Sequence, residues 1–141
     1  MKKTLFTTLC LAAVCLFALG CKDDEVPEGV YEYHAHIRQP GTTPKQLNDT
    51  MHIEIDFESH TGQPIHHIRI GILNIQTLDE AYIAPADFDI NDPDGDYRFE
   101  DDVVLSAANG FHTGTWTLEA KVWGPGDDEE LETETVTFTI Q

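Results

Sequence analysis

Basic residues are scarce in this 141-residue chain. It has 8 Lys+Arg against 26 Asp+Glu, which gives a formal net charge of −18 at pH 7. A surface of that sign repels the phosphates of nucleic acids and anionic lipid headgroups. Binding through a basic surface is therefore excluded, and we expect no nucleic-acid partner.

A long apolar run occurs only at the N-terminus. Lys2 and Lys3 precede an uninterrupted apolar stretch over residues 9–19, which closes on Gly20 and Cys21. This order is typical of a secretory signal peptide. At ~1.5 Å per residue the run is far shorter than a ~30 Å bilayer core, so a permanent transmembrane helix is the weaker interpretation. We expect residues 1–20 to be a cleaved signal peptide.

The end of this run carries a more specific pattern. The residues Ala18-Leu19-Gly20-Cys21 resemble the lipobox of bacterial lipoproteins, in which the cysteine is lipidated and becomes the first residue. Ala18 stands where that family usually has leucine. The resemblance implies a lipoprotein signal peptide and a membrane anchor through the lipid on Cys21. Plain secretion is the alternative.

Residues 21–30 follow as a lipidated cysteine and an acidic tether. The residues Lys22, Asp23, Asp24 and Glu25 resemble the export tag of Bacteroidota surface lipoproteins. That resemblance implies an outer membrane lipoprotein displayed at the cell surface, and a solvated acidic linker is the alternative. The stretch from Lys22 to Val30 can span at most ~30 Å when extended, enough to hold a domain just clear of a membrane.

Cysteine is also scarce, with three residues in the chain. Cys10 and Cys15 would leave with the signal peptide, and Cys21 would carry lipid. The mature chain of about 120 residues would then have no free thiol and no disulfide, which excludes cysteine chemistry. A chain of that length buries roughly two-thirds of its unfolded surface, enough for one domain stabilised by its own core. We place this domain at residues 31–141.

Apolar and polar residues alternate with a period of two through most of this domain, which is typical of half-buried β-strands. The alternating segments cover residues 31–38, 51–58, 68–72, 97–105, 116–123 and 135–140. Turn residues separate them, and no stretch repeats at helical spacing over ten residues. We therefore predict an all-β fold: an antiparallel immunoglobulin-like β-sandwich of about seven strands, rather than a barrel.

The last third of the domain supports this prediction. Segments 96–99, 114–123 and 134–140 resemble the closing strands of bacterial immunoglobulin-like modules. The resemblance implies a fold and no chemistry, because sandwiches of this kind host many functions.

Histidines gather on the outward faces of the first two predicted strands. His34 and His36 are two residues apart, ~7 Å along the same face of one strand, and His52 points outward from the next. Imidazole is a ligand for zinc and copper(II), and Glu54 offers a carboxylate beside them. We take His34, His36, His52 and Glu54 as a candidate zinc or copper site. A solvated polar face is the alternative interpretation.

This site depends on the register of the two strands. If Ile37 pairs with Met51, His36 faces His52, with ~5 Å between their Cβ atoms, and His34 faces Glu54. A register shifted by two residues would instead place His36 opposite Glu54.

A second histidine group flanks the turn at residues 61–64, and its members are His60, His66 and His67. The turn could bring His60 near His66, although this spacing matches no known metal motif. Segments 33–37 and 57–67 resemble histidine-bearing segments of uncharacterised Bacteroidota immunoglobulin-like lipoproteins. That resemblance implies no particular activity.

Oxygen ligands are densest between residues 87 and 96. The candidates are Asp87, Asp89, Asn91, Asp92, Asp94 and Asp96. Calcium takes six to eight such oxygens, but the spacing differs from an EF-hand because Ile90 would occupy the first ligand position. We rank calcium below zinc and copper, and an ordinary Asp-Pro-Asp-Gly turn is the alternative.

Candidate nucleophiles are few. Ser59 and Ser106 are the two serines, and neither lies in a nucleophile-elbow pattern. A sandwich with short turns has few places to bury a carboxylate and shift its pKa for acid–base catalysis. We predict a protein that is not an enzyme: a membrane-anchored binding module whose partner is a protein, a glycan or a metal. The specific alternatives are a zinc- or copper-binding lipoprotein and a calcium-stiffened adhesion domain.

Overall fold

The computed structural model describes residues 31–84, 88–126 and 132–141. The predicted lipidation site Cys21 and the export tag at residues 22–25 lie outside the described residues, and so does Asp87. The side chains of Asp89 and Asn91 are not described either.

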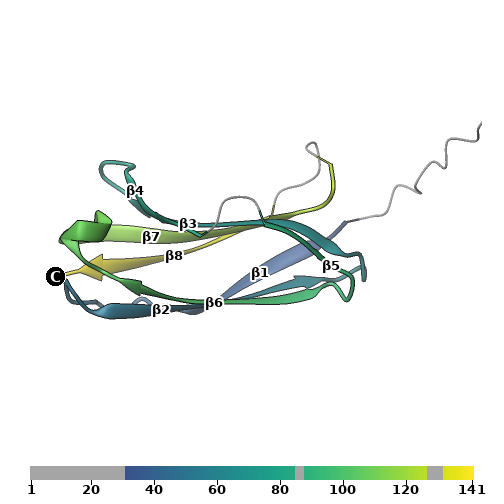
Figure 1. Cartoon of the computed structure of the whole chain (residues 1–141), viewed down its shortest axis with the longest axis horizontal. Helices are drawn as coiled ribbons and strands as arrows, with labels where there is room; N and C mark the ends of the chain where they lie inside the picture. Colours follow the sequence, from purple (N-terminus) through teal and green to yellow (C-terminus); the bar gives the residue numbers. More distant parts are fainter. Residues whose placement is uncertain (1–30, 85–87, 127–131) are drawn as a thin grey trace, which may run out of the picture.

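Two antiparallel sheets form the two layers of a sandwich (Figure 1). Sheet A has the order β1-β2-β6 and sheet B the order β4-β3-β7-β8, with β5 also pairing with β3. The strands of sheet A are β1 (Tyr33–Gln39), β2 (Thr50–Ser59) and β6 (Asp96–Val104). Those of sheet B are β3 (Ile65–Asn74), β4 (Glu80–Ile83), β5 (Phe88–Asp92), β7 (Gly114–Trp123) and β8 (Glu132–Ile140).

The prediction of an all-β, antiparallel, immunoglobulin-like sandwich is confirmed. About seven strands were expected and eight are present in the described residues, since the short β4 and β5 both pair along the edge of β3. Between β6 and β7 lies a 3-10 turn, η1 (Ala107–Asn109). None of the described residues belongs to a helix with the length and apolar character needed to cross a membrane.

The core lies between the sheets and follows the alternation of the sequence. On β2, Met51, Ile53, Ile55 and Phe57 are at most 3% exposed, while the residues between them point outward. Trp116 on β7 is fully buried and faces Phe138 on β8 in the same layer. Burying each such side chain contributes roughly 1.5–3 kcal/mol. The period of two therefore decides which face of each sheet is buried in the core.

One buried polar side chain organises the β3–β4 turn. The Oδ1 atom of Asn74 accepts hydrogen bonds from the backbone N–H groups of Gln76 at 2.9 Å and Thr77 at 3.1 Å. Its Nδ2 lies 3.3 Å from Nε2 of His112, and the backbone oxygen of His112 accepts a hydrogen bond from the indole of Trp116 at 2.9 Å. Because Asn74 is satisfied in this way, its burial is compatible with a stable core.

The outer face of sheet A carries rows of paired charges. Asp56 on β2 accepts hydrogen bonds from Nε of Arg98 on β6 at 2.6 Å and from Nε of Arg38 on β1 at 3.0 Å. These guanidinium groups, Arg98 first, hold the pKa of Asp56 below its usual range. Asp56 thus connects all three strands of the sheet. Basic residues of sheet B are also paired: Arg69 with Glu80, and Lys121 with Glu119.

Side chains join the two sheets along both edges of the sandwich. At one edge, the backbone N–H of Ile37 on β1 donates to Oε2 of Glu134 on β8 at 3.1 Å. At the other, the hydroxyl of Tyr82 on β4 donates to Asp101 on β6. His34 and His36 lie on β1, at the first of these edges.

Candidate metal centre

The register of β1 and β2 decides which histidines meet, and it is neither of the two registers considered from the sequence. Ile37 lies opposite Ile55 rather than Met51, so the strands are displaced by four residues from the pairing that would bring His36 to His52. The reason lies in residues 40–49, which do not form a tight hairpin. Lys45 instead pairs with the end of β8, through its N–H to the oxygen of Thr139 at 2.8 Å. The first half of β2 therefore passes beyond β1.

This displacement separates the histidines that were predicted to form one site. His34 and His36 remain together on β1, with stacked rings whose centroids are 6.2 Å apart. His52 lies opposite Asp102 on β6, with 2.8 Å between its Nδ1 and Oδ1 of Asp102. Glu54 contacts Arg98 at 3.4 Å. The structure thus pairs His52 and Glu54 with β6 rather than with His34 and His36.

A different set of potential ligands comes together at the other end of β2. Glu32, His34 and His60 each offer a ligand atom, and these three atoms all lie within 4.8 Å of one another. We call them the imidazole cluster. The rings of His34 and His60 have their centroids 4.2 Å apart. The backbone places them, since the N–H of His60 donates to the oxygen of Glu32 at 2.9 Å.

Further carboxylates surround the imidazole cluster. Oε1 of Glu58 lies 2.7 Å from Nε2 of His36 and 3.8 Å from Nε2 of His60. The hydrogen bond with His36 lowers the pKa of Glu58. Oε1 of Glu132, on β8, lies 3.9 Å from Nδ1 of His34. Contacts between histidines and glutamates therefore run from β8 through β1 to the end of β2.

The imidazole cluster has the composition of a transition-metal site. Two imidazoles and a carboxylate are ligands that zinc and copper(II) accept, and three protein ligands leave a fourth position for water. The side chains of Glu32, His34 and His60 are 59%, 35% and 49% exposed. A metal ion could therefore reach them from solvent without any rearrangement of the core.

The second predicted histidine group is divided between the sheets. His60 belongs to the imidazole cluster, at the end of β2. His67 on β3 stacks on Trp123 of β7, with ring centroids 5.3 Å apart, and the centroid of the His66 ring lies 6.3 Å from that of His67. His67 and Trp123 thus form an aromatic pair on sheet B.

The aspartate-rich segment contains a tight turn between β5 and β6. The Oδ1 atom of Asp92 accepts a hydrogen bond from the N–H of Asp94 at 2.9 Å, and Gly95 has a φ of 74°. This turn carries the chain from sheet B to sheet A, where the N–H of Ser59 donates to the oxygen of Gly95 at 2.8 Å. Among described side chains, the segment forms no group of three ligand atoms comparable to the imidazole cluster. A calcium site here stays a prediction.

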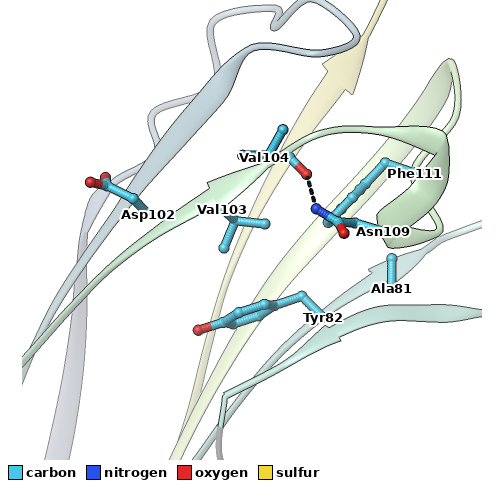
Figure 2. A pocket seen from close by; sticks show the side chains of 7 residues that line it. All are labelled: Ala81, Tyr82, Asp102, Val103, Val104, Asn109 and Phe111. Atoms are coloured by element: carbon cyan, nitrogen blue, oxygen red, sulfur yellow. Dashed lines mark hydrogen bonds between the residues drawn. The ribbon is translucent and has the colours of Figure 1, made fainter.

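A separate hollow of about 420 Å³ lies between β4, β6 and η1, at the opposite end of β6 from the imidazole cluster (Figure 2). Tyr82, Val103 and Phe111 supply much of its apolar lining, and Asp102 and Asn109 add polar groups. Burial, and then the hydrogen bond to Asp101, raise the pKa of Tyr82. The hollow is distinct from the candidate metal centre.

Sequence reasoning missed Glu32, Glu58 and Glu132. Glu32 and Glu58 each stand two residues before a histidine of the cluster, on the same strand face, and this spacing was the available signal. Glu132 carries no local signal, because it reaches His34 from the other sheet.

Comparisons with known proteins do not assign a family. No family model matches the chain and no curated protein matches it. Among solved structures, the CARDB domain of a Pyrococcus furiosus protein, in complex with di-metal ions, is 10% identical with a TM-score of 0.47, covering 79% of this chain and 96% of that one.

Two other solved structures show a similar level of likeness. A Niemann-Pick type C2 protein from the Japanese carpenter ant is 6% identical with a TM-score of 0.47, covering 79% of this chain and 91% of that one. A chitin binding domain from Burkholderia pseudomallei is 11% identical with a TM-score of 0.44, covering 70% of this chain and 57% of that one. The function is therefore argued from the residues of this chain.

Proposed function

We propose that this chain is a membrane-anchored, non-catalytic binding module of the cell surface, and that the ligand it holds is zinc or copper(II). The observation that carries the choice of ligand is the imidazole cluster, in which Glu32, His34 and His60 bring three ligand atoms within 4.8 Å. The anchor rests on the sequence around Cys21 and the acidic residues that follow it.

The geometry of the cluster suits a tetrahedral ion after small side-chain rotations. Zinc lies about 2.0–2.1 Å from nitrogen and oxygen ligands, so two ligand atoms on one ion are roughly 3.3–3.5 Å apart. Nδ1 of His60 already lies 3.9 Å from Oε1 of Glu32. Half-exposed side chains can close such a gap by changing rotamer, because no core packing holds them.

Electrostatics favour a cation at this edge. Glu58 and Glu132 add two carboxylates within 4 Å of the imidazoles of His60 and His34. Across the whole chain, 26 acidic residues outnumber the basic ones by 18. A negative field of this kind raises the local concentration of divalent cations.

The proposal of a non-catalytic role is supported by the fate of the serine nearest the cluster. The Oγ atom of Ser59 accepts a hydrogen bond from the backbone N–H of Gln63 at 3.0 Å, so it serves the turn after β2. Its side-chain partner is the hydroxyl of Thr61 at 3.5 Å, whereas a nucleophilic serine needs a neighbouring base to take its proton.

Isothermal titration calorimetry tests the ligand. The full-length protein, purified in detergent, is titrated with zinc chloride and with copper(II) sulfate. We expect binding by the wild type and at least a tenfold weaker Kd for His34→Ala and for His60→Ala. His52→Ala is the matched control, since His52 is an exposed imidazole of the same sheet that pairs with Asp102.

Two results would contradict the proposed ligand. One is the absence of binding heat with either metal. The other is an equal loss of affinity in His52→Ala and in the cluster variants, which would show that metal binds imidazoles without regard to their position.

A further inference from the structure

Each imidazole of the cluster has a carboxylate at the ring nitrogen that faces away from the proposed ion site. Nδ1 of His60 faces Glu32 at 3.9 Å, while its Nε2 faces Oε1 of Glu58 at 3.8 Å. Nδ1 of His34 faces Oε1 of Glu132 at 3.9 Å, which leaves Nε2 of His34 as the nitrogen available for a ligand.

This arrangement matches the way proteins hold metal-binding histidines. The ring nitrogen that does not bind the ion donates its proton to a carboxylate, which fixes the tautomer and the orientation of the ring. Glu58 would hold His60 with Nδ1 toward Glu32, and Glu132 would hold His34 with Nε2 free. The nitrogens left for an ion are then Nδ1 of His60, which faces Glu32, and Nε2 of His34.

The two carboxylates come from different sheets. Glu58 is on β2 of sheet A, on the same sheet face as the cluster, whereas Glu132 begins β8 of sheet B. Near this edge β1 and β8 are joined by the hydrogen bond from the N–H of Ile37 to Glu134. The contact between His34 and Glu132 is long at 3.9 Å, and its partners are 35% and 44% exposed, so by itself it contributes little.

Resting on the proposed metal site, we infer that Glu58 and Glu132 are positioning residues for His60 and His34, and that metal binding ties sheet A to sheet B across the β1–β8 edge. An ion at the cluster makes the outer N–H of each imidazole a stronger donor. The contact from His34 to Glu132 then shortens and links β1 to β8.

Glu58 is itself held in place from the other side. Its Oε1 lies 2.7 Å from Nε2 of His36, and His36 and His34 stack on β1. His36 thus keeps the carboxylate of Glu58 at the end of β2, near His60. His36 was predicted as a ligand, and this geometry gives it a supporting position instead.

Zinc titration of three single variants of the full-length protein in detergent tests the inference. Glu58→Gln and Glu132→Gln each remove a carboxylate next to an imidazole. Glu100→Gln is the matched control, because it makes the same charge change at an exposed position on β6. We expect a 10- to 100-fold weaker Kd for the first two variants and an unchanged Kd for the control.

Two readouts separate positioning from a general structural role. The Tm without metal should be the same for all three variants and the wild type, whereas the rise in Tm on adding zinc should shrink for Glu58→Gln and Glu132→Gln. Hydrogen exchange should show zinc slowing amides in both β1 and β8 of the wild type. In Glu132→Gln the slowing should be confined to β1.

The outcomes distinguish the inference from the proposed function. No binding of zinc or of copper(II) by the wild type overturns both. Zinc binding that His60→Ala abolishes, but that Glu58→Gln and Glu132→Gln leave unchanged, overturns the inference and supports the metal site. A weaker Kd that comes with a matching fall in the metal-free Tm also overturns the inference, because it assigns the two glutamates to the stability of the fold.

Discussion

Nδ1 of His52 lies 2.8 Å from Oδ1 of Asp102, directly across the pair of strands β2 and β6. This hydrogen bond, aided by the charges of Asp102, Glu100 and Glu54, raises the pKa of His52 above 6.5. Both side chains are exposed, at 48% and 67%. The pair is therefore a surface contact that responds to pH without disturbing the core.

The pair gives a pH prediction. Because the folded-state pKa of His52 lies above its unfolded value, its stabilising contribution is fully present below pH 6.5 and is lost as the pH rises through the raised pKa. An NMR titration of the imidazole protons should report this pKa, and Asp102→Asn should lower it toward 6.5. Asp101→Asn is the control and should leave it unchanged. An equal pKa in wild type and Asp102→Asn would contradict the assignment.

The hydrogen bond between Tyr82 and Asp101 connects the sheets at the edge opposite the imidazole cluster. Tyr82→Phe removes the donor, and we expect a loss of about 1 kcal/mol in the free energy of unfolding, measured by urea denaturation. Asp101→Asn should cost a similar amount, and the double variant should cost little more than either single one. Fully additive losses would show that the two side chains act independently.

Two glycines allow backbone strain to be separated from steric contact. Gly62 and Gly95 have φ values of 70° and 74°. A Cβ at Gly62 would meet nothing within 4 Å, whereas one at Gly95 would lie 3.0 Å from the oxygen of Gln63 and 3.1 Å from Cβ of Ser59. We expect Gly62→Ala to cost about 1–2 kcal/mol and Gly95→Ala clearly more. Thermal unfolding checks this, and equal costs would be inconsistent with the tight packing of Gly95.

The proposed anchor has its own test on intact cells. External protease should digest the wild-type protein if it is displayed at the surface. A variant with Asp23, Asp24 and Glu25 all changed to alanine should be protected, because it would stay on the periplasmic side of the outer membrane. Cys21→Ala should abolish labelling by radioactive palmitate. Survival of the wild type under protease would instead indicate a domain that faces the periplasm.

The sequence predicted the layers of the fold but not the partners within a layer. Alternation along residues such as Ile53 and Trp116 decides which side chains point inward, and the burial of both follows from it. Register is different, because a shift by two or four residues leaves every apolar side chain on the same face. The pairing of Ile37 with Ile55 therefore could not be predicted from the hydrophobic pattern alone.

The sequence predicted some residues of the candidate site, but not which of them lie together. His34 and His60 were both identified as potential ligands, but in separate groups. Their meeting depends on the path of residues 40–49, a connection of ten residues that is too long for its turn residues to fix the register of a tight hairpin. Glu132 is almost one hundred residues from His34 in the chain and lies on the other sheet. A contact of that kind leaves no periodic trace in a sequence.

The pairing of basic side chains has a consequence for neighbouring copies of the protein. Arg38 and Arg98 are both engaged by Asp56, and Arg69 and Lys121 by glutamates of sheet B. These ion pairs neutralise charge within the domain. Copies anchored as proposed would therefore repel one another through their excess of carboxylates.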